Sequence, residues 1–163
     1  MARFEDELLA VLPRLRRFAR ALVGNAADAD DLVQTSLEKA LRARALWNPG
    51  SRMDSWMYRI IRNASIDLGR ARTRAAQTFV GAEEGETVGD AGDHAIEAQV
   101  EAGYVMAAMR RLPEEQREAL ALVLVEGLAY KEAAAVLDVP SGTLTSRLVR
   151  GRQALMGMVG EAA

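Results

Sequence analysis

The stretch VLDVPSGTLTSRLVRGRQALMGMV, residues 136–159, decides the fold of the C-terminal part of the chain. Asp138 to Gly142 contains proline and glycine and separates two apolar-periodic runs, which predicts a turn between two helices. The run before the turn repeats at positions i, i+3, i+4 and i+7, and its small alanines allow another helix to approach closely: Tyr130, Ala133, Ala134 and Leu137. This arrangement is typical of a helix-turn-helix.

The helix predicted after the turn has two different faces. One side is apolar, with Leu144, Leu148, Leu155 and Val159. The opposite side is basic and hydrogen-bonding, which suits contacts with phosphates and base edges in a major groove: Thr143, Ser146, Arg147, Arg150 and Gln153. A solvated arginine face is the alternative, because this part of the chain has no net charge.

Charge divides the chain into three segments. Residues 1–74 carry net +5, residues 75–101 carry −7, and residues 102–163 carry 0, within a total of −2. The middle segment is rich in glycine and has no sustained periodicity, so we expect a flexible acidic linker. The sequence thus predicts two domains, at 1–74 and 102–163, joined by 75–101.

Both domains are predicted to be helical. Apolar residues from Phe4 to Leu22 recur at helical steps, and Pro13 is expected to kink or split that helix. Further helices are expected at about 28–44, from about Met53, and from near Tyr104 to a break at Leu112-Pro113. Asn48-Pro49-Gly50-Ser51 is expected to form a turn before the helix that begins at about Met53. The fold class is therefore all-α, with two small domains and a C-terminal helix-turn-helix.

Several classes of function are excluded by what the sequence lacks. It has no cysteine and no phosphate-binding loop, zinc helix or nucleophile elbow, and its single histidine, His94, lies in the predicted linker. The cluster Asp28, Asp30 and Asp31 fits helix capping rather than a metal site. We expect no enzyme activity, no cofactor, no metal and no membrane insertion, and a cytoplasmic location.

Two sets of motifs, one in each domain, resemble a known family. Leu112-Pro113, Arg117, Gly127–Ala134 and Val139–Leu148 resemble the C-terminal domain of extracytoplasmic-function sigma factors of bacterial RNA polymerase. Asp28–Gln34, Trp56–Asn63 and Asp67 resemble the other domain of that family, in the right order. The resemblance covers nearly the whole chain. It implies a factor that brings core RNA polymerase to promoter DNA and helps to melt it, under the control of an anti-sigma factor.

The resemblance also implies three sets of contact residues. The helix from about 28 to 44 would dock on the polymerase through Asp30, Asp31, Gln34, Thr35 and Glu38. The minus-ten element would meet a base-capturing loop and the helix that follows it, at Asn48, Ser51, Arg52, Arg59, Arg62 and Asn63. The minus-thirty-five element would meet the last helix, at Thr143, Ser146, Arg147, Val149 and Arg150.

Four positions leave questions open or depart from the family pattern. Trp56 is expected in the core, whereas Trp47 fits the core or a stack on a base equally well. Thr145 stands where the family often has a basic residue, which predicts a modest minus-thirty-five contribution. Ala129 replaces a serine, and the loss of a probable N-cap costs about 1 kcal/mol unless another group caps the helix.

Two other functions compete with a sigma factor. A sigma-like decoy would sequester an anti-sigma factor and would need no promoter-facing side chains. The known decoy type also carries a receiver domain, for which we expect no room in this chain. A plain helix-turn-helix repressor would leave residues 1–74 unexplained.

Overall fold

The computed structural model describes residues 2–78 and 96–162, and within these ranges every regular element is a helix. The N-terminal domain holds α1 (Ala2–Val23), α2 (Ala26–Arg42), the short 3₁₀ helix η1 (Arg44–Leu46) and α3 (Met53–Thr78). The C-terminal domain holds α4 (Ile96–Arg110), α5 (Glu114–Leu120), the π-helix η2 (Ala121–Val125), α6 (Tyr130–Leu137) and α7 (Ser141–Ala162). The all-helical, two-domain prediction is confirmed.

Helix α1 is continuous, so of the two expected effects of Pro13, a kink or a split, the split does not occur. Pro13 lies on the exposed side of the helix, one turn after the exposed Leu9. The Leu9 carbonyl, which loses its usual helical donor at Pro13, therefore faces water. The opposite side is buried as the apolar spacing predicts, and Leu15 and Phe18 are completely enclosed.

A tight corner joins α1 to α2. Gly24 adopts φ +84°, a left-handed conformation that suits glycine at a helix end. Asn25 then caps α2, because its Oδ1 accepts the Asp28 backbone N–H at 2.8 Å while its amide donates to the Asp28 carboxylate at 2.8 Å. The hydrogen bonds from Asn25 and Arg72 hold the pKa of Asp28 below its usual value. The cap of α2 is thus Asn25, and Asp28 supports it from the first turn of the helix.

The two tryptophans beside the start of α3 are buried to different degrees. Met57, Tyr58 and Ile61 are fully enclosed, whereas Trp56 is only half-buried. Trp47, before α3, is the buried tryptophan, and its ring meets Phe4 edge-on at a centroid distance of 5.4 Å. Trp56 packs against the core from its edge, with its ring 5.9 Å from that of Phe4, and Trp47 belongs to the core.

The helix-turn-helix consists of α6 and α7. Asp138 ends α6 in the left-handed conformation (φ 54°), and Ala133 and Ala134 are buried as expected, although Tyr130 is about half exposed. Ala129 gives α6 no side-chain cap, as its small side chain predicts. Gly151 lets α7 approach α5 closely, since a Cβ there would lie 3.1 Å from the Leu120 side chain.

Helix occupies both ends of the segment predicted as a linker. Helix α3 continues to Thr78, and α4 begins at Ile96 rather than near Tyr104. Ala, Glu and Gln at 97–102 are good helix formers, a signal that the acidic charge of the segment obscured. The rest of the predicted linker, residues 79–95, lies outside the described residues.

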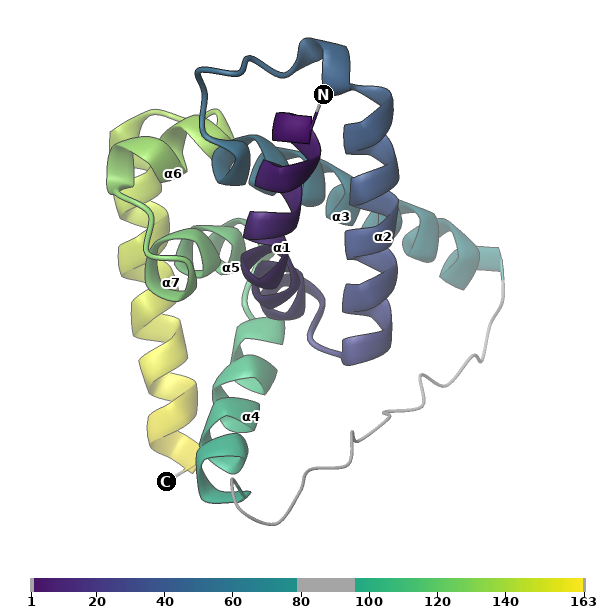
Figure 1. The fold of residues 1–163 in the computed structure, drawn as a ribbon. Helices are drawn as coiled ribbons and strands as arrows, with labels where there is room; N and C mark the ends of the chain where they lie inside the picture. The colour runs from purple at the N-terminus through teal and green to yellow at the C-terminus, as the bar shows by residue number, and fades with distance from the viewer. Residues whose placement is uncertain (1, 79–95, 163) are drawn as a thin grey trace.

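The two domains contact each other directly. Helix α1 packs on α2 and α3 of its own domain and also on α4, α5 and η2 of the other. Figure 1 shows α1 in the middle, between α2 on one side and the helices α5 to α7 on the other. Helix α3 in turn contacts α6. Residues from both domains therefore meet along one face of α1 and α3.

Candidate nucleic-acid interface

Helix α7 presents an exposed face that carries Arg150. Leu144 and Leu148 are buried against the domain, which turns Ser146, Val149 and Arg150 toward solvent. Arg150 has no ion-pair partner among the described residues. The two other predicted contact residues, Thr143 and Arg147, are half-buried, and Arg147 lies at the edge of the face, 3.9 Å from the Glu115 carboxylate.

The loop between η1 and α3 has a defined shape. The Asn48 Oδ1 accepts the Gly50 backbone N–H at 3.0 Å, and the Asn48 carbonyl accepts both the N–H (2.9 Å) and the hydroxyl (2.7 Å) of Ser51. This is the predicted turn, closed by a side chain that mimics a backbone acceptor. Asn48 and Ser51 are exposed, so the loop is set in place and open to solvent.

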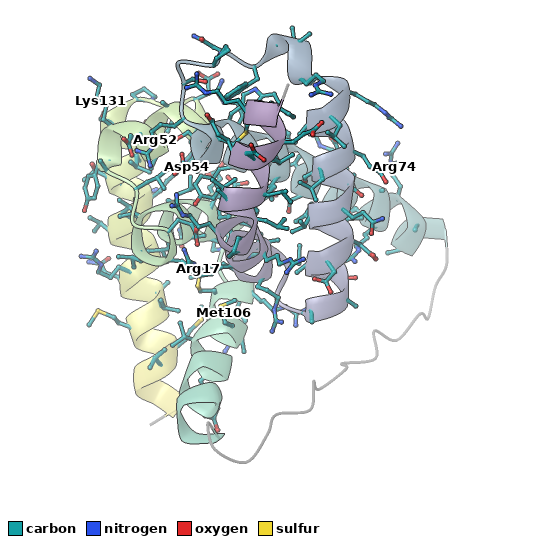
Figure 2. The ribbon with its side chains drawn as sticks, viewed as in Figure 1. Arg17, Arg52, Asp54, Arg74, Met106 and Lys131 are labelled. Carbon is teal, nitrogen blue, oxygen red and sulfur yellow. The ribbon has the colours of Figure 1, made fainter. Side chains whose placement is uncertain are left out.

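The arginines predicted to hold the minus-ten strand bond to the C-terminal domain instead of pointing freely into solvent. The Arg62 Nε lies 3.1 Å from the Glu118 carboxylate, and the Arg59 guanidinium donates to the Ala135 carbonyl. Arg52, which Figure 2 labels close to Asp54, pairs with Glu132. Asn63, on the same helix, is exposed.

A second set of hydrogen bonds connects the domains, and its acceptor is the Glu126 carboxylate. Its side chain is fully buried and accepts two hydrogen bonds from Arg17, at 2.8 and 3.1 Å, and one from the Tyr58 hydroxyl at 2.7 Å. Burial and the bond to Glu126 raise the pKa of Tyr58 well above its usual value. The π-helix η2 sets the position of Glu126. Its wider turn brings the Glu126 N–H to the Ala121 carbonyl at 2.9 Å.

These contacts form one set, which we call the interdomain clasp. It joins four arginines of the N-terminal domain to four acceptors of the C-terminal domain. The pairs are Arg17 with Glu126, Arg52 with Glu132, Arg59 with the Ala135 carbonyl, and Arg62 with Glu118. Burial raises the pKa of Glu118 against the opposing effect of the Arg62 charge. The two buried carboxylates are therefore neutralised by cations of the other domain.

Asp54 anchors Arg52 at the start of α3. Its buried carboxylate accepts two hydrogen bonds from Arg52, at 2.8 and 3.1 Å, and lies 3.2 Å from Arg14. Burial alone would raise the pKa of Asp54, but bonds from Arg52 and the Ser55 N–H outweigh it and hold the pKa below its usual value. The charged Asp54 therefore fixes Arg52 beside the Asn48 loop.

Helix α2 carries a polar face without internal partners. The five residues predicted to dock on the polymerase are all exposed, and none forms an ion pair within the described parts of the chain: Asp30, Asp31, Gln34, Thr35 and Glu38. The buried side of the helix, which includes Leu32, Val33 and Ala40, fixes the orientation of this face. Three carboxylates therefore point together into solvent.

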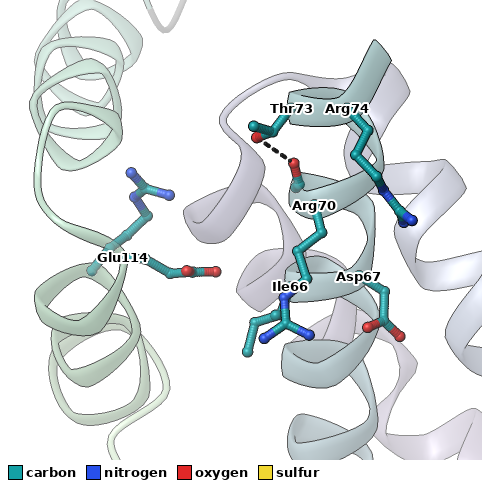
Figure 3. A pocket seen from close by; sticks show the side chains of 8 residues that line it. Ile66, Asp67, Arg70, Thr73, Arg74 and Glu114 are labelled. Carbon is teal, nitrogen blue, oxygen red and sulfur yellow. Dashed lines mark hydrogen bonds between the residues drawn. The ribbon is translucent and has the colours of Figure 1, made fainter. Parts of the chain in front are cut away.

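An open groove of about 970 Å³ lies between α3 and the start of α5 (Figure 3). Its lining mixes both signs of charge, with Glu114 of α5 extending toward Arg70 of α3, whereas Asp67 points away from Glu114. Arg117 also lines it, but its guanidinium is already bonded to the carbonyls of Met109, Arg110 and Leu112. The lining of the groove therefore has no strong excess of either charge that would favour one class of charged ligand.

Each of the two domains matches a family model of known proteins. The family model "Sigma2 domain of PhyR" matches residues 8–62, and the model "Sigma-70, region 4" matches residues 102–155. The ECF RNA polymerase sigma factor EcfG of Rhodopseudomonas palustris is 38% identical over 154 residues, covering 94% of this chain and 83% of the relative. This chain belongs to the extracytoplasmic-function sigma factor family. As a sigma factor, it directs RNA polymerase to promoters and is not an enzyme.

Solved structures resemble this sigma factor over its full described fold. The sigma factor RpoE of Bartonella quintana, in complex with the anti-sigma factor NepR, superposes with a TM-score of 0.86 at 31% identity, covering 98% of both chains. The structure of CnrH in complex with the cytosolic domain of CnrY superposes with a TM-score of 0.73 at 23% identity, which shows the shared fold.

The sequence analysis of this sigma factor missed the residues that connect its two domains. Tyr58, Glu118 and Glu126 are buried polar side chains with partners in the other domain. Glu126 had a visible signal, because it is an acid directly after the apolar run Ala119–Val125. Its partner Arg17 had none, because nothing in its local pattern indicates a contact more than a hundred residues away.

The described residues were also searched for metal sites and for membrane-spanning helices. No group of three or more His, Asp or Glu side chains in the described ranges is placed to hold a metal ion. Among the helices that the structure describes, none combines the length and the apolar character needed to cross a membrane.

Proposed function

We propose that this sigma factor divides promoter recognition between its domains. The N-terminal domain, residues 1–74, binds core polymerase through the exposed face of α2 and the minus-ten element through the Asn48 loop and α3. The C-terminal domain, residues 102–163, binds the minus-thirty-five element through α7, and residues 75–101 connect the two. The ordered and exposed Asn48 loop carries this proposal, because a loop that captures an unpaired base must be pre-shaped and open.

We also propose an anti-sigma factor as a regulatory partner and the cytoplasm, where RNA polymerase acts, as the location. The Bartonella sigma factor that resembles this chain over 98% of its length was solved with an anti-sigma factor. That relative is 31% identical to this chain, which supports a similar kind of partner here.

A sigma-like decoy is the competing function. The match of residues 8–62 to a domain of PhyR points in that direction, and PhyR is described as an anti-anti-sigma factor. The PhyR structure is only 17% identical to this chain, so the likeness concerns the fold. A decoy needs neither the exposed Arg150 nor the exposed Asn48 loop, and both favour promoter binding.

The melting role is tested by Asn48→Ala. We expect this variant to impair initiation on duplex promoters, and to be closer to wild type on a template with a premelted bubble. The reason is that unpairing, which costs a few kcal/mol, is already supplied there. The measurement is the ratio of mutant to wild-type run-off transcription on both templates, with core polymerase binding measured alongside.

Asn48→Asp is the matched control for the shape of the loop. It keeps the oxygen that accepts the Gly50 N–H but removes the amide that would donate to a base. A defect in Asn48→Asp like that of Asn48→Ala would assign the effect to base contact. Equal defects of Asn48→Ala on duplex and bubble templates would contradict a melting role.

The minus-thirty-five role is tested by Arg150→Ala. We expect promoter binding by the holoenzyme to weaken by about 1–3 kcal/mol, because an exposed arginine on the proposed recognition face is lost. Arg152→Ala removes the same charge from the other side of α7 and is the control. Promoter affinity in a filter or mobility assay should fall for Arg150→Ala well beyond Arg152→Ala, and similar losses would argue for a general charge effect.

A further inference from the structure

Helix α3 has a basic end, residues 69–76, which we call the projecting end. Every residue of this stretch, GRARTRAA, is exposed, and it holds three arginines and no acid. In Figure 1 this part of α3 extends past α2, on the side of the molecule away from α7. Alanine and arginine are good helix formers, so the helix continues here without a buried side. An exposed cluster of arginines along a helix is typical of a surface that binds nucleic acid.

The three arginines of the projecting end lie on two sides of the helix. The Arg72 guanidinium bonds to the Asp28 carboxylate of α2 at 2.8 Å. Arg70 and Arg74 are each two residues away from Arg72, so at about 100° per residue both lie on the roughly opposite side of α3. They are four residues apart and are therefore neighbours on that side. Arg70 and Arg74 thus form a pair of exposed cations.

The acids nearest to this pair do little to offset its charge. The Asp67 carboxylate, one turn before the pair, lies 3.5 Å from the Lys39 ammonium of α2. Glu114 of α5 extends toward Arg70 from the other side of the groove, but it is exposed, so water and salt screen its charge. Positive charge therefore dominates the projecting end.

The pair continues the side of α3 that the proposed function gives to the minus-ten element. Asn63, an exposed residue of that proposed site, lies seven residues before Arg70, which is almost two full turns. Asn63 and Arg70 therefore share a side of α3, about 10 Å apart along its axis, and Arg74 lies about 6 Å further. Duplex DNA rises about 3.4 Å per base pair, so the pair reaches about three to five base pairs beyond Asn63.

We propose that Arg70 and Arg74 bind backbone phosphates of the duplex DNA upstream of the minus-ten element, between the two promoter elements. The Asn48 loop, proposed to capture an unpaired base, precedes the other end of α3, and a helix-turn-helix binds paired DNA. The DNA between the elements therefore stays paired. The contact reads no sequence, because the arginines meet phosphates rather than base edges. The proposal rests on the proposed binding of the minus-ten element by α3.

The variant that removes the pair is Arg70→Ala with Arg74→Ala. Both side chains are exposed and alanine favours helix, so the fold is expected to be kept. The matched control is Arg16→Ala with Arg20→Ala, which removes two exposed arginines that are also four residues apart, on α1. Arg70→Lys with Arg74→Lys keeps both charges, and we expect it to bind like wild type because an ammonium also binds phosphate.

The measurement is the affinity of the holoenzyme for two fluorescein-labelled templates, read by anisotropy over a series of salt concentrations. The full template carries both promoter elements and the duplex between them, whereas the short template begins at the minus-ten element. On the full template we expect the alanine variant to bind about tenfold more weakly, also when the sequence between the elements is scrambled. Its salt slope should be smaller by about 2, one for each lost phosphate contact. On the short template it should bind like wild type.

Equal weakening by the alanine variant and the Arg16 and Arg20 control would overturn the upstream contact, and so would a loss of the same size on the short template. If Asn63→Ala still weakens binding to the short template in either case, the proposed minus-ten function stands alone. If Asn63→Ala has no effect there, the assignment of α3 to the minus-ten element fails. The upstream contact, which rests on that assignment, then fails with it.

Discussion

Phe18→Ala is expected to lower the free energy of unfolding by about 3–5 kcal/mol, the range for removing a buried phenylalanine side chain. Phe18 is completely enclosed, and its ring meets Tyr58 edge-on at a centroid distance of 5.0 Å. It lies on α1, which packs against both domains. Loss of the ring therefore leaves a cavity where Tyr58 is held for its bond to Glu126.

Denaturant unfolding measures this loss, with two probes to test two-state behaviour. Both tryptophans, Trp47 and Trp56, lie in the N-terminal domain, so their fluorescence reports on that domain, whereas circular dichroism reports on all helices. Leu9→Ala on the same helix is the control. Leu9 is 66% exposed, and we expect a change within about 0.5 kcal/mol. Similar midpoints for both variants would contradict the packing described for α1.

Asp31→Lys combined with Glu38→Lys is expected to weaken binding to core polymerase about 100-fold or more, which corresponds to about 2.7 kcal/mol. Both carboxylates are exposed on the α2 face without ion-pair partners in the described chain. If this face docks on the polymerase, reversed charges face groups that they repel, and such contacts cost several kcal/mol.

The matched control is Asp6→Lys with Glu114→Lys, which reverses two exposed acids elsewhere on the described surface. Polymerase affinity is measured by fluorescence titration with labelled sigma factor, and the unfolding midpoint is measured in parallel. Unchanged binding of the α2 variant would remove the docking role from this face. Equal weakening by the control would make the effect one of net charge.

The helices and the family were predictable from sequence because their signals are local. Apolar spacing located α1 and α2, and proline and glycine located the Asn48 turn and the turn before α7. Local signals also failed in places. Propensity alone predicts a kink or a split of α1 at Pro13, whereas the helix, packed on its opposite side, is not split.

The partners of the site residues were not predictable, because they depend on how the two domains meet. Arg62 was recognised as a cation of the site, but its bond to Glu118 joins residues 56 positions apart. The tryptophans show the same limit. Trp47 and Trp56 have similar chemistry and both meet the Phe4 ring edge-on, yet Trp47 is enclosed whereas Trp56 is half-buried.

The π-helix η2 makes the connection between the domains depend on register. The Glu126 N–H reaches five residues back, to Ala121, where a regular α-helix would reach four. Closing Ala121–Val125 as a regular α-helix with every residue kept would rotate Glu126 by about 100°, away from Arg17 and Tyr58. Substitutions that favour the regular helix would therefore uncouple the domains while every charged residue of the clasp stays in the chain. Two homologues with identical clasp residues can then differ in the connection of their domains through the form of this one turn.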